Sequence, residues 1–299
     1  MLESMYLLAL IMAVVEDALI VAGGLGTRMY PISTFLPKES LPLVDIPVLI
    51  HLAQEAKAAG VKRIHIITSP NKDLSPLLKD VSHLHHNRPE LDESLFSSFS
   101  NIEISVHVQE QQLGLGDAIL TALDEVQGPF LVLLGDNVII DNHSSSRDYT
   151  PSNASKLLVD CFEKNNLPCG AILSVPDEEL SSYGVVELDG ELIKNVIEKP
   201  QSGFAPSNFV LCGRYIFTDD CKKLLNEIYT VEKFGELQSI ELQKHWMNGD
   251  GFIGVNLDGF SWYDSGNPYS WLQAQVDHAL QRDDLSKQFS DWLKLRIKD

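Results

Sequence analysis

The chain has 299 residues, of which 44% are hydrophobic and 22% are charged, so it can bury the core of an ordinary soluble globular protein. Its 42 acidic residues outnumber its 23 Lys and Arg residues and give a formal net charge of -19. So acidic a protein repels polyanions, which argues against binding along a nucleic acid or at an anionic membrane. A phosphorylated ligand would need a local site with a few cations and a metal ion.

Residues 1–17 are expected to form an N-terminal extension. The apolar run from Met5 to Val15 is shorter than the roughly 20 residues that span a bilayer, and Glu3 stands where a signal peptide would carry a basic residue. The segment is therefore not expected to be a targeting signal. An extension from an upstream start and a short packing helix both remain open.

Strands and helices are predicted to alternate in the first half of the chain. Apolar or alternating runs predict strands at 18–22, 63–68, 102–108 and 130–134, and helical spacing predicts helices at 48–59, 71–80 and 117–126. This alternation is typical of a doubly wound, mainly parallel Rossmann-like sheet with helices on both faces. The run HLHH, at 83–86, falls in a polar loop without further metal-ligand partners.

The second half of the chain is richer in strands. Runs at 171–175, 184–188, 192–198, 209–217, 251–257 and 260–264 predict a mixed extension of the sheet. Two C-terminal helices are expected at about 268–299, with a polar break near Asp283 and Asp284. Because no Pro- or Gly-rich linker interrupts the chain, 18–299 is expected to be a single domain. The four cysteines form no C-x-x-C pair, which predicts reduced thiols in a cytoplasmic protein.

Polar side chains follow three predicted strands, at the sheet edge where α/β proteins bind ligands. The first strand is followed by GGLGTR, in which glycines allow backbone N–H groups to approach phosphates and Arg28 can contact phosphate oxygens. Asp136 and Asp264 follow two later strands, and such carboxylates can share one Mg²⁺. Each motif alone is also typical of an ordinary turn. Met29 and the absence of G-K-[ST] argue against the dinucleotide and P-loop fingerprints.

Taken in order, the motifs resemble those of the sugar-1-phosphate nucleotidyltransferases, over nearly the whole chain. The landmarks are GLGTR, PKESLPLVD, a Gln followed by GLG, GDN, YGVV, EKP and a late W-x-D-x-G. The resemblance implies a nucleotide-diphospho-sugar transferase fold. It also implies the reaction of a nucleoside triphosphate with a sugar 1-phosphate to give an NDP-sugar and pyrophosphate. An oxygen of the sugar phosphate would attack the α-phosphorus, with no protein nucleophile.

The resemblance also implies roles for individual residues. The catalytic cations would be Arg28, Lys38 and Lys199. Mg²⁺ would be held by Asp136 and Asp264. The nucleotide would be bound by Ala22, Gly23, Gly24, Gly26, Thr27, Glu39, Gln109 and Gly114. The sugar would be bound by Gly184, Glu198 and Asn208.

Within the family, PKESLPLVD, the long loop before Ile102 and WYDSGN are most similar to the branch that uses UTP and glucose 1-phosphate. Asn137, in GDN, instead resembles the thymidylyltransferases. Thr34, Asp117 and the run ELQSIE from Glu236 depart from the uridylyltransferase pattern. A thymidylyltransferase or another NDP-sugar pyrophosphorylase, and a non-catalytic sugar-nucleotide-binding regulator, therefore stay open as alternatives. The family suggests a homodimer or homotetramer.

Overall fold

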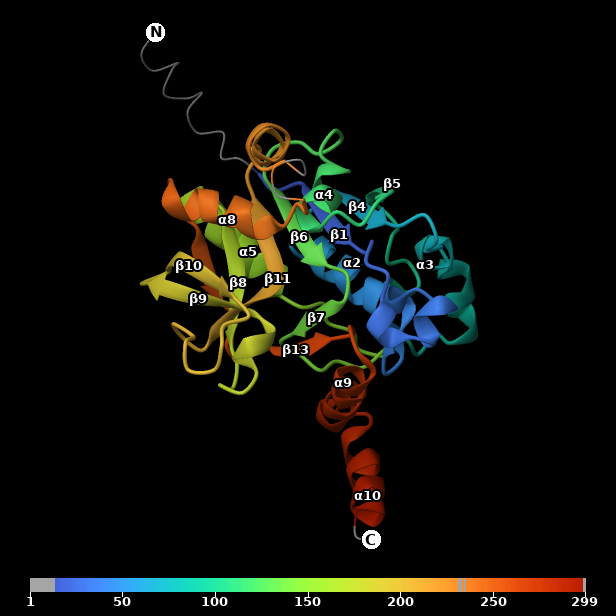
Figure 1. Ribbon diagram of the computed structural model, residues 1–299. Coiled ribbons are helices and arrows are strands. Elements are labelled where there is room, and N and C mark those ends of the chain that lie inside the picture. Colours follow the sequence, from blue (N-terminus) through green and yellow to red (C-terminus); the bar gives the residue numbers. More distant parts are fainter. Residues whose placement is uncertain (1–13, 231–232, 234, 298–299) are drawn as a thin grey trace.

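The computed structural model describes residues 14–230, 233 and 235–297, so most of the expected N-terminal extension lies outside the described residues. Within the described part, nine strands form one twisted sheet (Figure 1). From one edge to the other, these strands are β5 (Glu103–Val108), β4 (Arg63–Thr68), β1 (Asp17–Val21), β6 (Phe130–Leu134), β11 (Phe209–Phe217), β8 (Cys169–Ser174), β12 (Ile253–Asn256), β10 (Leu192–Glu198) and β9 (Gly184–Asp189).

The sheet changes character at β11. The strands β5, β4, β1 and β6 are parallel to one another, as predicted for the first half of the chain. β11 runs antiparallel to both β6 and β8, and β10 and β9 add antiparallel pairs beyond β12. The prediction of a parallel sheet with a mixed extension is therefore confirmed.

Helices cover both faces of this sheet. On one face, α2 (Val48–Ala58) and α5 (Ala154–Asn165) pack against one set of strand residues, which includes Ala18 and Ile20 of β1. On the other face, Leu19 packs with α4 (Leu115–Leu120), α6 (Cys221–Lys223), the π-helix Leu224–Ile228 and α8 (Ser239–Asn248). Because β1 is buried on both faces, its continuous apolar run predicted a strand correctly.

Two helical predictions differ from the structure. The helix expected at 71–80 is reduced to α3 (Ser75–Leu78), because the Asp73 carboxylate accepts a hydrogen bond from the Ser75 N–H at 2.9 Å and starts the helix late. The helix expected at 117–126 is α4, which begins directly after Gly114 and ends earlier. The sequence interpretation did not include α5 or α8. The His83–His86 run lies in a short 3₁₀ helix, Ser82–Asn87.

A small antiparallel ribbon stands outside the main sheet. β7 (Asn137–Ile140) pairs with β13 (Ser261–Asp264), so the strand predicted at 260–264 does not extend the large sheet. A second hairpin joins β2 (Pro42–Leu43) to β3 (Ile46–Pro47). The ribbon lies across the lower side of the sheet in the view of Figure 1.

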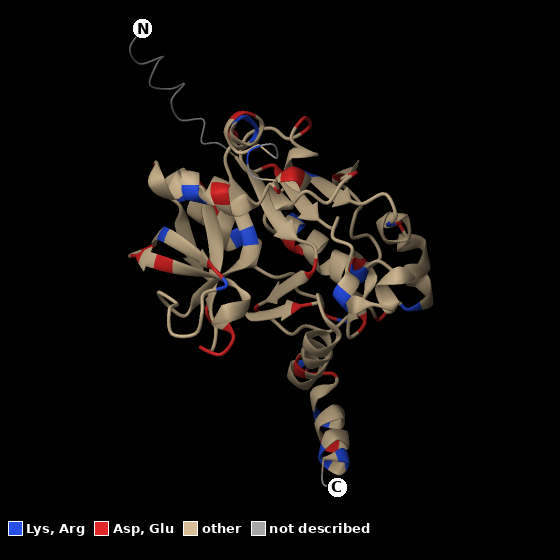
Figure 2. Ribbon diagram, viewed as in Figure 1, with Lys and Arg blue, Asp and Glu red and all other residues tan. Residues whose placement is uncertain are grey.

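The chain ends in α9 (Pro268–Gln281) and α10 (Ser286–Arg296), with the predicted polar break between them. Arg282 is buried at this break and binds the carboxylates of Asp45 and Asp284. α10 projects away from the body of the molecule and has no buried residue among those described (Figure 1). Acidic positions are spread over the whole fold (Figure 2).

The four cysteines are free thiols, as predicted. In the described part of the chain, we find no helix with the length and apolar character needed to cross a bilayer.

Candidate active site

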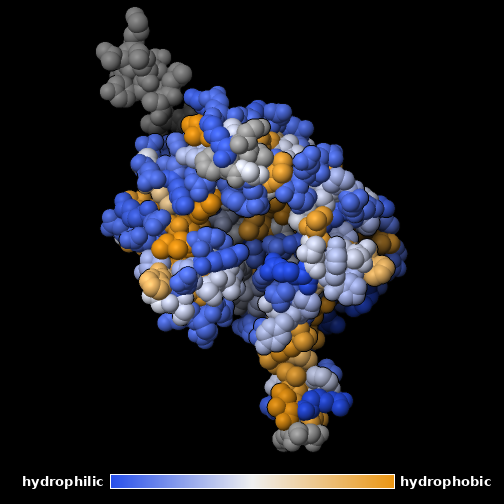
Figure 3. Space-filling model, in the orientation of Figure 1, coloured by the Kyte–Doolittle hydropathy of each residue, from blue (hydrophilic) through white to orange (hydrophobic). Residues whose placement is uncertain are grey.

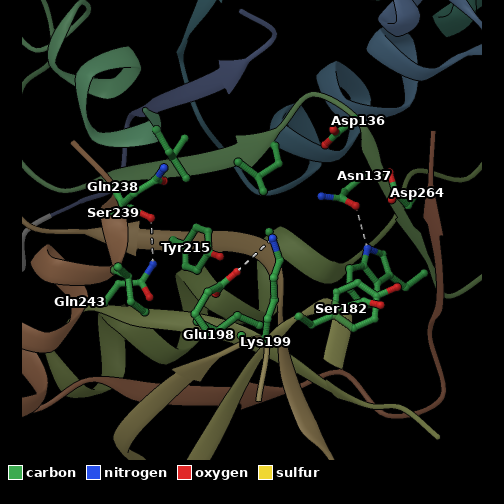
Figure 4. Close-up of a pocket in the computed structure, with 18 of the residues that line it drawn as sticks. Asp136, Asn137, Ser182, Glu198, Lys199, Tyr215, Gln238, Ser239, Gln243 and Asp264 are labelled. Atoms are coloured by element: carbon green, nitrogen blue, oxygen red, sulfur yellow. Dashed lines mark hydrogen bonds and ion pairs between the residues drawn. The ribbon is translucent and has the colours of Figure 1, made fainter. Parts of the chain in front are cut away.

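A cavity of about 870 Å³ opens where the ends of β6 and β10 meet α8 and the β7–β13 ribbon (Figure 4). The surface is hollowed between these elements (Figure 3). Six of the residues predicted from the sequence line this cavity: Arg28, Asp136, Gly184, Glu198, Lys199 and Asp264. Residues more than 100 positions apart in the chain therefore meet at one site, at the predicted edge of the sheet.

The ribbon brings the two predicted metal carboxylates together. Asp264 pairs in register with Asn137, the residue after Asp136. The Ser265 N–H donates to the Asp136 carbonyl at 2.8 Å, and the Gly266 N–H donates to Asp264 Oδ1 at 2.6 Å. A Cβ atom at Gly266 would lie 2.6 Å from Asp264 Oδ1 and 2.9 Å from Arg28 Nη2. Glycine at this position is what allows the carboxylate and Arg28 to approach the backbone.

Lys38 reaches the same pair of carboxylates from the 3₁₀ helix Lys38–Ser40. Its Nζ lies 2.5 Å from Asp136 Oδ2, and the residue is only 8% exposed. Burial would raise the pKa of Asp136, but the charge and hydrogen bond of Lys38 outweigh it and hold that pKa below its usual range. Burial, together with the neighbouring charge of Asp136, instead raises the pKa of Asp264. Two carboxylates with opposite shifts at one site are typical of a functional centre.

The glycine loop lies beside Lys38. Gly26 has φ 64°, and its carbonyl accepts a hydrogen bond from Ser33 Oγ at 2.7 Å. A Cβ atom at Gly24 would lie 3.9 Å from Lys38 Nζ. Thr27 is exposed and begins the 3₁₀ helix Thr27–Met29, which carries Arg28. The loop, the lysine and the arginine therefore belong to one continuous surface next to the ribbon.

Lys72 is a residue of this region that sequence reasoning missed. Its Nζ donates to the Ala22 carbonyl at 2.6 Å and to Glu39 Oε1 at 2.8 Å. Glu39 has no exposed surface, and burial raises its pKa. Its carboxylate therefore contacts Lys72 behind the glycine loop, and Lys72 ties the loop to the segment that carries Lys38. No motif pointed to Lys72, because its partners lie 33 and 50 residues away.

Gln109 and Gly114 form a second set of contacts, next to Gly23 of the glycine loop. Gln109 Nε2 donates to Asp117 Oδ2 at 2.8 Å and to the Gly114 carbonyl at 3.2 Å. An ionised carboxylate only accepts hydrogen bonds, so Asp117 fixes the orientation of the amide. Gln109 Oε1 is then directed at Gly23, where a Cβ atom would lie 2.9 Å away. Asp117, a departure from the family pattern, thus orients the predicted base-reading residue.

Glu198 and Lys199 lie on the opposite wall of the cavity. Their side chains are 60% and 64% exposed, and Lys199 Nζ lies 3.8 Å from Glu198 Oε1. An exposed ion pair at this distance contributes little to stability, so both groups stay available to a ligand. Gly184 pairs in register with Glu198, and a Cβ atom there would lie 3.1 Å from Glu198 Oε2.

Asn208 is the predicted sugar-binding residue that does not line the cavity. It is exposed, and its carbonyl accepts a hydrogen bond from the Val175 N–H at 3.0 Å. Asn137, whose presence in GDN resembled the thymidylyltransferases, has a structural contact in which its Oδ1 accepts a hydrogen bond from Trp262 Nε1 at 3.0 Å. The Trp262 ring in turn packs against Tyr183, with ring centroids 4.8 Å apart.

Several further lining residues come from elements that the sequence did not connect with the site. Tyr215 of β11 and three polar residues at the start of α8 face the cavity in Figure 4. These are Gln238, which directly precedes α8, and Ser239 and Gln243 of α8. Two of them overlap the run ELQSIE, which the sequence identified only as a departure from the family pattern.

This fold, with a glycine loop, cations and paired carboxylates around one cavity, is that of a nucleotidyltransferase. The chain belongs to the nucleotidyl transferase family, which matches residues 17–281. Among curated relatives, UTP--glucose-1-phosphate uridylyltransferase 1 of Staphylococcus saprophyticus is 31% identical over 298 residues, covering 94% of this chain and 98% of that protein. UTP--glucose-1-phosphate uridylyltransferase of Bacillus subtilis is 31% identical over 293 residues, covering 94% and 96%.

A solved structure of UDP-glucose pyrophosphorylase complexed with UDP-glucose matches with a TM-score of 0.75 and 29% identity. The match covers 88% of this chain and 98% of that one. The predicted family and the predicted fold class are confirmed.

Proposed function

We propose that this protein transfers a uridylyl group from UTP to glucose 1-phosphate, giving UDP-glucose and pyrophosphate. The observation that carries the proposal is the convergence of Arg28, Lys38, Lys199, Asp136 and Asp264 on one cavity and its rim. The names of the two relatives and the bound UDP-glucose of the solved structure support the choice of substrates.

The chain's own residues bind and orient two anions. An oxygen of the sugar phosphate attacks the α-phosphorus of UTP in line, the bond from that phosphorus to the bridging oxygen breaks, and pyrophosphate leaves with the electron pair. Arg28 and Lys38 offset the negative charge of the triphosphate and of the leaving pyrophosphate, and backbone N–H groups at 23–27 bind the same oxygens. Lys199 binds the sugar phosphate and Glu198 accepts from sugar hydroxyls. Holding the reactants together supplies much of the rate acceleration.

Asp136 and Asp264 would hold Mg²⁺ in this reaction. The donor set fits, because two adjacent carboxylates offer hard oxygen ligands and the pKa of Asp264 is raised by burial and by Asp136, as expected where a neutralising cation is needed. When bound, the ion supplies Lewis-acid stabilisation of phosphoryl charge. Lys38 contacts Asp136 directly and therefore sits within reach of the same phosphates.

Gln109 favours a base whose ring carries an N–H at its Watson–Crick edge. Because Asp117 accepts from Nε2, the amide presents Oε1, which only accepts hydrogen bonds, toward the loop at Ala22 and Gly23. Uracil N3–H is a donor, whereas cytosine N3 and adenine N1 are acceptors. The geometry supports UTP over CTP and ATP. It does not distinguish UTP from dTTP or GTP, whose bases also carry a ring N–H, and the assay below compares them.

Pyrophosphate release measured with UTP, dTTP, CTP, ATP and GTP, each with a panel of sugar 1-phosphates and Mg²⁺, tests the proposal. We expect the highest kcat/KM for UTP with glucose 1-phosphate. A preference for dTTP would replace the proposal with the thymidylyltransferase alternative. UDP-glucose binding without any turnover would replace it with the non-catalytic regulator.

We further propose that residues 18–299 act as one nucleotidyltransferase domain, that the protein works in the cytoplasm, and that it forms a homodimer or homotetramer. The free cysteines support a reducing compartment. The exposed apolar side chains of α10 and of the residue that follows it support self-association, since Trp292 is 48%, Leu295 71% and Ile297 78% exposed. Light scattering of the purified protein measures the oligomeric state, and a monomer would contradict that part.

A further inference from the structure

A second cluster of metal-ligating side chains lies at the edge of the sheet, on β4, β5 and the segment after α4. It consists of His65, His107 and Glu125, whose ligand atoms all lie within 4.8 Å of one another. Among the described residues it is the one such group of three His, Cys, Asp or Glu side chains, and neither Asp136 nor Asp264 is part of it. The roles derived above for the chain do not use any of its members.

His65 is held in the orientation of a metal ligand. Its Nε2 lies 3.1 Å from Asp17 Oδ1, and Asp17 is fully buried and also binds Arg63 and the Gln127 N–H. A carboxylate only accepts hydrogen bonds, so a proton on Nε2 faces Asp17 and Nδ1 is the ring nitrogen that faces His107. A carboxylate that accepts from the second nitrogen of a histidine is the usual support of a histidine metal ligand.

The second ring nitrogen of His65 lies near the other two ligand atoms. His65 Nδ1 lies 3.0 Å from His107 Nε2, which in turn lies 3.9 Å from Glu125 Oε2. Two nitrogens bound at about 2.0–2.1 Å to a tetrahedral Zn²⁺ are separated by about 3.3 Å. To bind one ion, the two nitrogens must move apart by a few tenths of an ångström, and both rings must turn from facing each other toward the ion. Two histidines and one carboxylate form the three-ligand set of open zinc sites.

We propose that His65, His107 and Glu125 bind one divalent transition-metal ion, with Zn²⁺ as the ion that suits these ligands and a water in the fourth position. Entry is open from the surface, since the Glu125 side chain is 58% exposed whereas those of His65 and His107 are 2% and 9% exposed. The net charge of -19 raises the local concentration of divalent cations.

An ion bound at this site would link two parts of the chain. His107 is two residues before Gln109, and Glu125 follows α4, which begins after Gly114. The ion joins the two ends of the segment that carries the base-reading side of the active site. Closing this segment stabilises the fold by linkage, because the unfolded chain does not present the preformed ligand set.

Co²⁺ titration of the full chain, without nucleotide or Mg²⁺, tests this site, because four-coordinate Co²⁺ has a much stronger visible absorption than six-coordinate Co²⁺. We expect one equivalent of the four-coordinate spectrum, lost on adding Zn²⁺, and a higher thermal midpoint with Zn²⁺. Glu125→Gln, at a mostly exposed position, and His107→Gln should each weaken Co²⁺ binding by at least about tenfold. Circular dichroism verifies that both variants are folded.

Two control variants locate the ion. Asp264→Asn alters the candidate active site and should keep the four-coordinate spectrum. His83→Gln removes a histidine from the exposed run at 83–86 and should also keep it. The proposal is overturned if wild-type protein shows no such spectrum, if the spectrum survives in both Glu125→Gln and His107→Gln, or if either control loses it. A spectrum absent from wild type would mean that the two histidines only hydrogen-bond to each other.

Discussion

The candidate site has two walls, a proposed nucleotide side and a proposed sugar side, which differ in how their charged groups are paired. On the nucleotide side, Lys38 is bonded to Asp136 and Lys72 to Glu39, and the side chains of both lysines are only 10% exposed. On the sugar side, Glu198 and Lys199 are more than half exposed and 3.8 Å apart. One wall is preorganised by buried ion pairs, and the other is open and loosely paired.

This difference has a physical reason and a catalytic consequence. Buried charges must be paired, because an unpaired charge at such depth costs several kcal/mol. The nucleotide side therefore holds its cations in place before the substrate arrives, which is how electrostatic stabilisation is obtained without reorganisation. The exposed sugar-side groups retain their solvation and act mainly through ground-state binding. Substitutions on the two walls should consequently change different kinetic constants.

Asp136→Asn is expected to have the largest effect. The side chain keeps its size but loses the charge that pairs with Lys38 and that would hold Mg²⁺. We expect kcat to fall by at least about a thousandfold, which corresponds to several kcal/mol of transition-state stabilisation. Pyrophosphate release at saturating substrates measures it. Asp189→Asn, at an exposed position of β9, is the matched control, and near-normal turnover of Asp136→Asn would refute the metal role.

Lys38→Ala is expected to have the next largest effect. It removes a preorganised cation from the nucleotide side and leaves Asp136 without its direct partner. We expect kcat/KM to fall on the order of a hundredfold, mainly through kcat, if the contact strengthens in the transition state. Lys62→Ala, whose side chain is 67% exposed, provides the control. A change in the free energy of unfolding with unchanged kinetics would show that Lys38 has only a structural role.

Lys199→Ala tests the open wall. Its ammonium is exposed and only loosely paired, so its removal should weaken the binding of the sugar phosphate and little else. We expect KM for glucose 1-phosphate to rise by about tenfold, with KM for UTP and the thermal midpoint unchanged. Lys194→Ala, on the strand β10 that directly precedes Lys199 and with its side chain 47% exposed, is the control. A loss confined to kcat would remove the distinction between the two walls.

The sequence was informative where one local pattern determines both structure and chemistry. The apolar runs located β1, β4, β6 and β11, and the polar residues after β1 and β6 located Arg28 and Asp136, because parallel strands bring their carboxyl ends to one edge. Asp264 was found at the end of a predicted strand, but it reaches the site through the antiparallel β7–β13 ribbon. The sequence could not reveal Lys72, whose partners are brought near only by the folded chain. It also missed α8 and its cavity residues, which required knowledge of how the helix packs on β10.

The smallest predicted effect is a change of stability with pH, caused by buried histidines next to the β7–β13 ribbon. His278 of α9 contacts His143, which follows β7, with their Nδ1 atoms 2.9 Å apart, and His51 lies nearby with its Nδ1 3.2 Å from Tyr149 Oη. Burial, followed by repulsion from nearby cationic groups, lowers the pKa of His278 to about 3. Burial likewise lowers that of His51 to about 4.

These shifts determine how stability should depend on pH. Above the usual histidine pKa of about 6.5, the rings are neutral in both the folded and the unfolded state and contribute no pH dependence. Below this pKa, the unfolded chain binds protons that the folded protein does not bind. The free energy of unfolding therefore decreases as the pH is lowered. We expect the free energy of unfolding to be lower by roughly 1 to 2 kcal/mol per histidine at about pH 5.5 than at about pH 7.5.

Urea unfolding at the two pH values measures this loss. His278→Gln should reduce the loss, whereas His86→Gln, at an exposed position, should not. Equal stability at the two pH values would mean that the histidines next to the ribbon are solvated. The ribbon would then be as accessible to solvent as the sugar-side wall.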